Sequence, residues 1–363
     1  MRRAITGMKG SRRLMAGLSL IELMVALVLG LLVVAAAIGI FLSNRQAYRT
    51  TESVGRVQES ARVAFELMAR DVREAGGNAC NASGESGSIA GVPLVNVLAN
   101  PAANWWSNWG NVPGTGRLNG ALVGYGPGNA VPGLSTGVGN AQRMAGTEAL
   151  VVLSGGSRVA VVDAHAPGSH SFTVMDAGHG FQTGDVLLVC GQDNNGITTP
   201  ADATGRVITS SAIFRMTNGG GSTVIQHEAG GGNATGELGP CLPSCPATFG
   251  QHASISRVRA AVWYIGNGTD GPALYQAMLG GGGNVTNQEI IPGVTGMVLQ
   301  YLLRGAANYV DVDAVPADGW GNVVAVRMTL QLESSGPEGN TGTDGNPIRR
   351  QLVQVANLRN RSL

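Results

Sequence analysis

The sequence feature that most constrains the fold is a long apolar run near the amino terminus. Residues 18–42 contain a single charged side chain, Glu22, among leucine, valine, alanine and isoleucine. As an α-helix rising about 1.5 Å per residue, this run would extend about 37 Å, which is enough to cross the hydrocarbon core of a bilayer. The 17 residues before it carry five basic side chains and no acid. This asymmetry predicts that the basic flank stays in the cytoplasm and that the remaining chain lies on the other side of the membrane.

A cleaved secretory signal and a plain membrane anchor are two simpler interpretations of this run. The apolar core of a signal peptide is ordinarily about 7–15 residues long and is followed by small residues. This run is longer, and Ser43, Asn44 and Arg45 follow it. A plain anchor explains every residue except Glu22, because a carboxylate within an apolar membrane helix costs a few kcal/mol. We therefore expect Glu22 to have a functional partner.

The helical pattern continues beyond the apolar run. Apolar residues recur there at three- and four-residue spacing: Val54, Val57, Ala61, Ala64, Phe65, Met68 and Val72. Opposite charges at i,i+4, such as Glu66 and Arg70, lie between them. Proline is absent before Pro93, and two glycines at 76 and 77 favour a helix end. The pattern predicts one helix over residues 18–75, apolar all round in its first half and amphipathic in its second.

Residues 17–27, Gly-Leu-Ser-Leu-Ile-Glu-Leu-Met-Val-Ala-Leu, resemble the prepilin processing motif of type IV pilins and type II secretion pseudopilins. That motif comprises a basic leader, a glycine, an apolar residue and a glutamate five residues after the cut. The resemblance implies that a membrane prepilin peptidase cuts between Gly17 and Leu18 and methylates the new amino terminus. Two departures are Leu18, where the family prefers phenylalanine, and a long leader, so that Met8 is an alternative start.

The same resemblance implies an assembly role for Glu22. In family filaments the glutamate is thought to pair with the terminal amine of a neighbouring subunit. Such a pair would neutralise two charges in a low-dielectric bundle of apolar helices, where one unpaired charge is costly.

The remaining chain, residues 76–363, has no second apolar run of this length. A stretch rich in glycine, asparagine, proline and serine reaches to about residue 147 and precedes a strand-rich part. Strands are predicted over residues 149–153, 158–163, 185–190, 206–209, 212–217, 223–227, 254–265, 273–279, 294–303, 323–332 and 351–358. A long helix packed on an antiparallel sheet belongs to the α+β class, of type IV pilin-like architecture by the resemblance. We expect a leader over residues 1–17, a helix over 18–75 with a membrane span over 18–42, and a β-rich periplasmic or extracellular domain over 76–363.

Four further parts of the chain resemble, in order, the PilW-type minor pilins. They are residues 56–80 at the helix end, 185–190 with 212–214, 320–330, and the tail 355–361. The resemblance implies a non-enzymatic minor pilin that primes type IV pilus assembly and sits in a tip complex. Its implied partners are other minor pilins, the major pilin, the prepilin peptidase, the inner-membrane assembly platform and a tip adhesin. The alternatives are a J-type pseudopilin of type II secretion and a membrane-anchored periplasmic binding or adhesive protein.

The cysteines all follow the apolar run and therefore fall on the predicted periplasmic side, where disulfides persist. They are Cys80, Cys190, Cys241 and Cys245. The even count favours structural disulfides, with three pairings open, whereas free thiols or a metal are the alternatives. The spacing between Cys241 and Cys245 does not fit a redox C-x-x-C motif.

Three tryptophans, Trp105, Trp106 and Trp109, lie within five residues of one another in a polar, glycine-rich context. Packing against the helix or sheet is one interpretation. An exposed contact patch for a partner pilin or a glycan is the other, because tryptophan is enriched at interface anchors. The sequence does not choose between them.

Composition and motifs favour no enzyme, no cofactor, no resident metal and no nucleic-acid partner. The net charge of +1 lacks the basic excess typical of nucleic-acid binders. The five histidines form no H-E-x-x-H pair. Asp311, Asp313 and Asp318 gather carboxylates in one segment, but their spacing fits no EF-hand, so that a solvated turn is the simpler interpretation.

Overall fold

The computed structural model describes residues 19–77, 88–89, 92–112, 116–117, 120–166, 168–192, 209–239, 249–334, 346–359 and 361. The chain divides into two units, Met1–Glu52 and Ser53–Leu363. The first unit holds the apolar half of a helix, and the second holds the rest of that helix and the sheets.

The helix α1 spans Leu20–Glu74 as one element of 55 residues, close to the predicted range of 18–75. Gly76 ends it with a left-handed φ of 72°, a conformation that favours glycine. The N–H of Gly76 then donates to the carbonyl of Leu153 at 2.8 Å. The chain therefore leaves the helix directly onto a strand of the larger sheet.

The larger sheet has 13 strands in the order β10-β7-β6-β11-β8-β9-β2-β3-β4, with β1 on β2, β5 on β6, β12 on β11 and β13 on β12. The strand bounds are β1 (Ser88–Ile89), β2 (Val92–Asn96), β3 (Asn111–Val112), β4 (Gly116–Arg117), β5 (Leu122–Tyr125), β6 (Ala149–Ala164), β7 (Ser171–Val174), β8 (Val186–Gln192), β9 (Thr209–Arg215), β10 (Val224–Gln226), β11 (Ser254–Gly268), β12 (Gly271–Leu279) and β13 (Val285–Pro292). Pairing is antiparallel except where β2 meets β9 and β3. One-turn 3-10 helices lie at η1 (Pro101–Ala103), η2 (Ala177–His179), η3 (Gly281–Gly283), η4 (Val312–Ala314) and η5 (Gly319–Asn322).

A bulge divides the long strands β6 and β11 between two sets of neighbours. The register of β11 against β6 shifts between Ser256 and Val258. Before the shift β11 also pairs with β8, and after it with β12. A Cβ at Gly156 would lie 2.9 Å from the carbonyl oxygen of Arg257, so the close approach at the bulge requires glycine.

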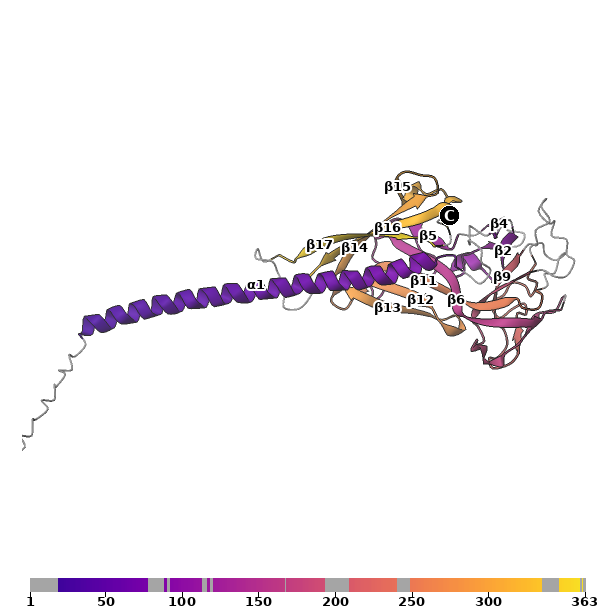
Figure 1. The fold of residues 1–363 in the computed structure, drawn as a ribbon, viewed down its shortest axis with the longest axis horizontal. Coiled ribbons are helices and arrows are strands. Elements are labelled where there is room, and N and C mark those ends of the chain that lie inside the picture. Colours follow the sequence, from indigo (N-terminus) through magenta and orange to yellow (C-terminus); the bar gives the residue numbers. More distant parts are fainter. Residues whose placement is uncertain are drawn as a thin grey trace, which may run out of the picture. The chain divides into compact units, whose positions relative to one another are not determined.

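The smaller sheet has four antiparallel strands in the order β15-β14-β16-β17. Their bounds are β14 (Val294–Leu303), β15 (Tyr309–Asp311), β16 (Val323–Glu333) and β17 (Arg349–Asn357). Buried and exposed positions alternate along β14 and β16, which places one face of this sheet in the core and the other in solvent. In Figure 1 the carboxyl-terminal part of α1 runs alongside β14 and β11.

The main core forms where the second half of α1 meets both sheets. The buried helix residues are Ala61, Ala64, Phe65, Met68, Ala69, Val72 and Ala75, which include the predicted apolar positions from Ala61 to Val72. They pack with side chains of β5, β6, β11, β12, β14 and β16, among them Leu150, Trp263 and Met328. Two further apolar clusters lie within the larger sheet and its loops. The result is a long apolar helix joined to a β-rich antiparallel domain, which is an α+β arrangement.

Most predicted strands are present, with three differences. The two strands predicted over 149–153 and 158–163 are one strand, β6, because the bulge at its glycines interrupts the apolar pattern without ending the ladder. Of the strand predicted over 206–209, only Thr209 is described, and it begins β9. Strands β1, β2, β3, β4, β5, β7, β13 and β15 were not predicted; β13 reads as polar because its residues from Val285 to Glu289 are exposed on both faces of the sheet.

Candidate assembly interface

The apolar half of α1 presents a surface that nothing within the described chain covers. Leu20–Glu52 is long and apolar enough to cross a membrane, with a mean hydropathy of 3.0 and no buried residue in its most apolar window. Large side chains such as Leu20 and Ile21 are 79% and 71% exposed. Such a surface needs apolar surroundings, which a bilayer or the packed helices of other subunits can supply.

Glu22 lies in the first turn of this helix. Its backbone N–H donates to the hydroxyl of Ser19 at 3.2 Å, and the N–H of Leu23 donates to the carbonyl of Ser19 at 3.1 Å. Ser19 is thus the N-cap, and the spacing Ser19-x-x-Glu22 is that of a capping box. The cap fixes where the helix begins, and the carboxylate lies next to the positive end of the helix dipole. Gly17 and Leu18, the predicted processing residues, lie outside the described residues.

A buried polar cluster fixes the other end of α1 to the larger sheet. Asp71 is 3% exposed, and one of its carboxylate oxygens accepts a charged hydrogen bond from the Arg259 guanidinium of β11 at 2.6 Å. Its other oxygen accepts from Trp263 Nε1 at 3.0 Å and from Gln276 Nε2 at 2.8 Å. Arg259 also binds the Glu74 carboxylate at 2.5 Å. Both oxygens of Asp71 are satisfied, so the helix end has one register on β11 and β12.

Burial raises the pKa of the Asp71 carboxyl, while the charge of Arg259 and the hydrogen bond from Trp263 oppose that rise. A buried carboxylate of this kind is strongly destabilising once a partner is removed. Asp71 was not predicted as a site residue. The missed signal was its spacing, since it lies three residues after Met68 and four before Ala75, on the face that packs into the core.

The tryptophans of the segment 105–109 lie against an apolar cluster inside the protein. Trp105 and Trp109 are 1% and 0% exposed and pack in the apolar cluster with β6, β8 and β11, and Trp106 lies partly buried against it. Asn96 holds the segment, since its Nδ2 donates to the carbonyls of Ser107 at 2.8 Å and Trp109 at 2.7 Å. This burial corresponds to the packing interpretation and not to an exposed contact patch, because the rings fill a hydrophobic core.

Cys190, the fifth residue of β8, is disulfide-bonded. The other three cysteines, Cys80, Cys241 and Cys245, lie outside the described residues. Within the described ranges, no group of three or more histidine, cysteine, aspartate or glutamate side chains has an arrangement suited to a metal ion.

Three histidines gather beside β7 and β10. The ring centroid of His227 lies 5.4 Å from that of His165 and 6.1 Å from that of His170. Burial lowers the pKa of His227 to about 3, and its Nδ1 donates to the carbonyl of Gly236 at 2.9 Å. Burial also lowers the pKa of His165. His170, partly exposed, has a raised pKa because of its hydrogen bonds to Glu237 and then Glu228.

We expect stability to fall in acid through His227. Its folded pKa lies below the unfolded value of about 6.5, so protonation favours the unfolded state as the pH drops from about 6.5 towards 3. Between pH 8 and pH 5 the loss is about 2 kcal/mol, with His165 adding to it and His170 opposing it. Urea unfolding of the detergent-solubilised chain at both pH values measures the loss. A His227→Phe variant should show a weaker pH dependence, and an unchanged one would contradict the assignment.

The two units together define a class of protein. A β-rich unit, Ser53–Leu363, here called the head, is joined to a helix that is long and apolar enough to anchor it in a membrane. Residues 262–360, from β11 through β17, match the family model of the Type IV Pilus-assembly protein W, PilW. This match supports the PilW family and a part in type IV pilus assembly. None of the curated proteins compared with the chain matches it.

Proposed function

We propose that this chain is a non-enzymatic minor pilin that primes type IV pilus assembly and sits in a complex at the pilus tip. The observation that carries the proposal is α1. Its first half is apolar and unburied, and its second half is built into the core of a head whose last strands match the PilW family. A helix of this kind can be held first by a bilayer and then by neighbouring apolar helices, with no change in the head.

The proposal includes two processing steps and one pairing. A prepilin peptidase removes residues 1–17 and methylates the amino group of Leu18. The head lies in the periplasm while α1 spans the inner membrane with its amino terminus in the cytoplasm. On assembly, the Glu22 carboxylate pairs with the terminal amine of a neighbouring subunit. The partners are other minor pilins, the major pilin, the assembly platform and a tip adhesin.

Replacing Gly17 by leucine is expected to block processing. A peptidase site that accommodates only glycine before the cut excludes the larger side chain, so the chain keeps its 17-residue leader and the amino group of Leu18 is not methylated. Mass spectrometry of the amino terminus measures both changes. Gly10→Leu, in the same leader but outside the motif, is the matched control and should be processed normally. A Gly17→Leu chain that still shortens contradicts the prepilin assignment.

Deleting the gene tests pilus assembly against the alternatives. Loss of surface pili and of twitching motility, restored by the unaltered gene, supports the minor pilin. Loss of protein secretion with pili retained would instead support a J-type pseudopilin. Retention of both, together with glycan binding by the purified chain, would support a membrane-anchored binding or adhesive protein. The PilW match over residues 262–360 favours the first outcome.

A further inference from the structure

The strand β17 forms an edge of the smaller sheet. It pairs with β16 along all nine of its residues and with no other described strand. The register is unbroken from Arg349 to Asn357. None of the described backbone hydrogen bonds outside the strand ladders involves residues 349–357. Within the described part of the chain, the outward-facing N–H and C=O groups of this strand therefore have no partner, and another strand could bond to them.

The other sheet edges in the described part of the chain are protected against the addition of another strand. The opposite edge, β15, and the edge β10 have three residues each, β1 and β4 have two, and β5 has four. The edge strand β13 is longer, but its register shifts opposite Leu274 and Tyr275, and it ends in Pro292. Short strands, bulges and proline are the ordinary protections against strand addition. After the arginines at 349 and 350, β17 has neither charge, proline nor bulge.

The exposed side chains of β17 suit a strand neighbour. Val353 and Val355 are 58% and 43% exposed, although β-branched residues are ordinarily covered in a sheet. They lie on the solvent face, in the same rows as Thr329 and Arg327 of β16. An added strand with β-branched residues opposite the two valines would form favourable cross-strand pairs.

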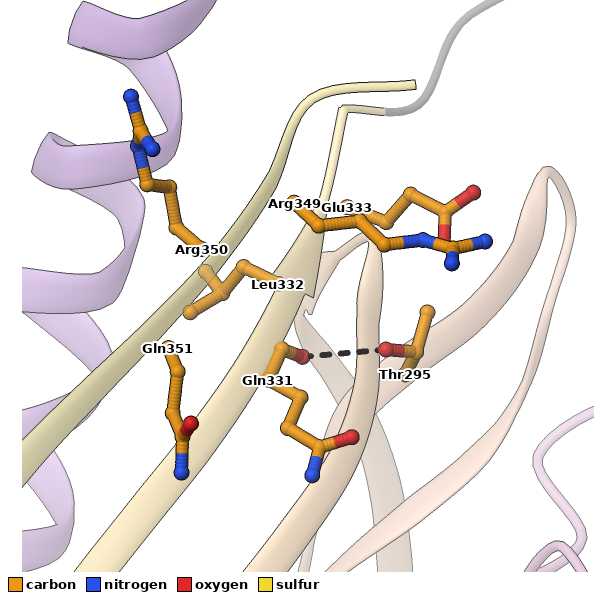
Figure 2. Close-up of a pocket in the computed structure, with 7 residues that line it drawn as sticks. All are labelled: Thr295, Gln331, Leu332, Glu333, Arg349, Arg350 and Gln351. Atoms are coloured by element: carbon orange, nitrogen blue, oxygen red, sulfur yellow. Dashed lines mark hydrogen bonds and ion pairs between the residues drawn. The ribbon is translucent and has the colours of Figure 1, made fainter. Parts of the chain in front are cut away.

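The two arginines at the start of β17 differ in their partners. Arg349 forms an ion pair with the Glu333 carboxylate at 3.2 Å, so its charge is already paired within the sheet. Arg350 has no ion pair or hydrogen bond among the described contacts and points away from Glu333 (Figure 2). Beside them is a cavity of about 530 Å³, lined by Thr295, Gln331, Leu332, Glu333, Arg349, Arg350 and Gln351. The free guanidinium beside an open cavity suits a carboxylate side chain from a partner.

We propose that β17 is a docking edge for a strand from the head of another pilin in the same tip complex. The incoming strand adds to the four-stranded sheet, places β-branched residues opposite Val353 and Val355, and brings an aspartate or glutamate to Arg350. This inference rests on the proposed function, which supplies the other pilin.

A second copy of this chain suits the edge less well. Two copies related by a two-fold axis would pair their β17 strands antiparallel. Centred on Val353, that pairing places Arg350 opposite Ala356 and Arg349 opposite Asn357. No carboxylate would meet Arg350, so the charges favour a different pilin as the partner.

The first test compares the full chain alone with the full chain co-expressed with the minor pilins of its own gene cluster and purified in detergent. Amide hydrogen exchange within residues 349–357 is expected to slow by about tenfold or more in the complex, because the outward N–H groups become bonded. Unchanged exchange in a complex that does form overturns the docking edge. Concentration-dependent protection in the chain alone identifies a second copy as the occupant and also overturns the proposal.

The second test uses variants at the edge with matched controls. Val353→Lys with Val355→Lys should weaken co-purification of the partner by about tenfold or more. Val298→Lys lies in the same row as Val353, on β14, and is 39% exposed, so it adds a lysine to the same face away from the edge. That control should co-purify normally. Arg350→Glu should weaken binding where Arg350→Lys largely keeps it.

These outcomes separate the two proposals. If the unaltered chain captures no other minor pilin and its deletion leaves pili intact, the proposed function fails. If the unaltered chain forms the complex and the edge variants bind as well as the Val298→Lys control, only the docking edge fails. Melting temperatures of all variants identify any loss of binding that is due to misfolding.

Discussion

Replacing Glu22 by leucine is expected to leave the chain stable in the membrane and to abolish its entry into the pilus complex. The substitution removes a carboxylate whose insertion into an apolar environment costs a few kcal/mol, so membrane retention should not fall. The neighbour's terminal amine, however, would lose its partner inside a bundle of low dielectric constant, where an unpaired charge is strongly unfavourable. We expect co-purification with other minor pilins to fall by about tenfold or more, together with surface pili.

The side chain of Glu22 allows the pairing to be separated from simple packing. Glu22→Gln keeps the shape and removes the charge, so it should be as defective as Glu22→Leu, whereas Glu22→Asp should retain part of the assembly. Glu59→Gln removes an exposed carboxylate from the second half of the same helix and is the matched control. Membrane fractionation and immunoblotting measure retention. Normal co-assembly of Glu22→Leu would refute the pairing.

Replacing Asp71 by alanine is expected to cost the head about 3–5 kcal/mol of its free energy of unfolding. The change leaves three donors without their acceptor: the indole N–H of Trp263, the side-chain amide of Gln276 and the guanidinium of Arg259. In the folded protein they bind the Asp71 carboxylate at 2.6–3.0 Å. For a head of this size the melting temperature should fall by roughly 10 °C. Thermal unfolding of the detergent-solubilised full chain, followed by near-ultraviolet circular dichroism, measures the loss.

A matched carboxylate on the same helix provides the control. Glu66 pairs with Arg62 at 3.2 Å, but both side chains are largely exposed at 66% and 73%. Exposed pairs at i,i+4 contribute at most a few tenths of a kcal/mol, so Glu66→Ala should leave the melting temperature nearly unchanged. If Asp71→Ala and Glu66→Ala behaved alike, the buried cluster would not be what fixes the helix to β11 and β12.

Local pattern was a sufficient guide for the helix and for most strands. The face formed by Ala61, Phe65, Met68 and Val72 could be predicted because helical periodicity depends only on spacing within one element. The strand Val294–Leu303 coincides with its prediction because it is rich in apolar residues and its buried positions alternate from Met297 to Tyr301. Strand β13 was missed because its first five residues, Val285 to Glu289, are exposed on both faces of the sheet, so that no apolar alternation marks them.

In the candidate site, too, some features follow from local pattern and others depend on residues far apart in the chain. The position of Glu22 in the first turn of an apolar helix could be predicted, because a lone carboxylate in an apolar run can be recognised from the order of residues alone. Its pairing with a neighbour's amine stays a prediction. The pairing of Asp71 with Arg259 could not be predicted, because 188 residues separate the two in the chain. The direction in which Trp105 and Trp109 face was equally undetermined, since it depends on Asn96 and on the cluster into which the rings pack.

The sequence by itself therefore determined the elements that local periodicity and hydropathy control: an apolar helix half that requires a bilayer or other helices, its amphipathic continuation, and a β-rich remainder. The tertiary structure decided which long-range partners each element finds. It pairs Asp71 with Arg259 and buries Trp105 and Trp109 in an apolar cluster. It also leaves β17 as the one long unprotected edge among the described strands. The physical reason is that burial, ion pairing and strand exposure depend on neighbours in space, which the order of residues along the chain does not reveal.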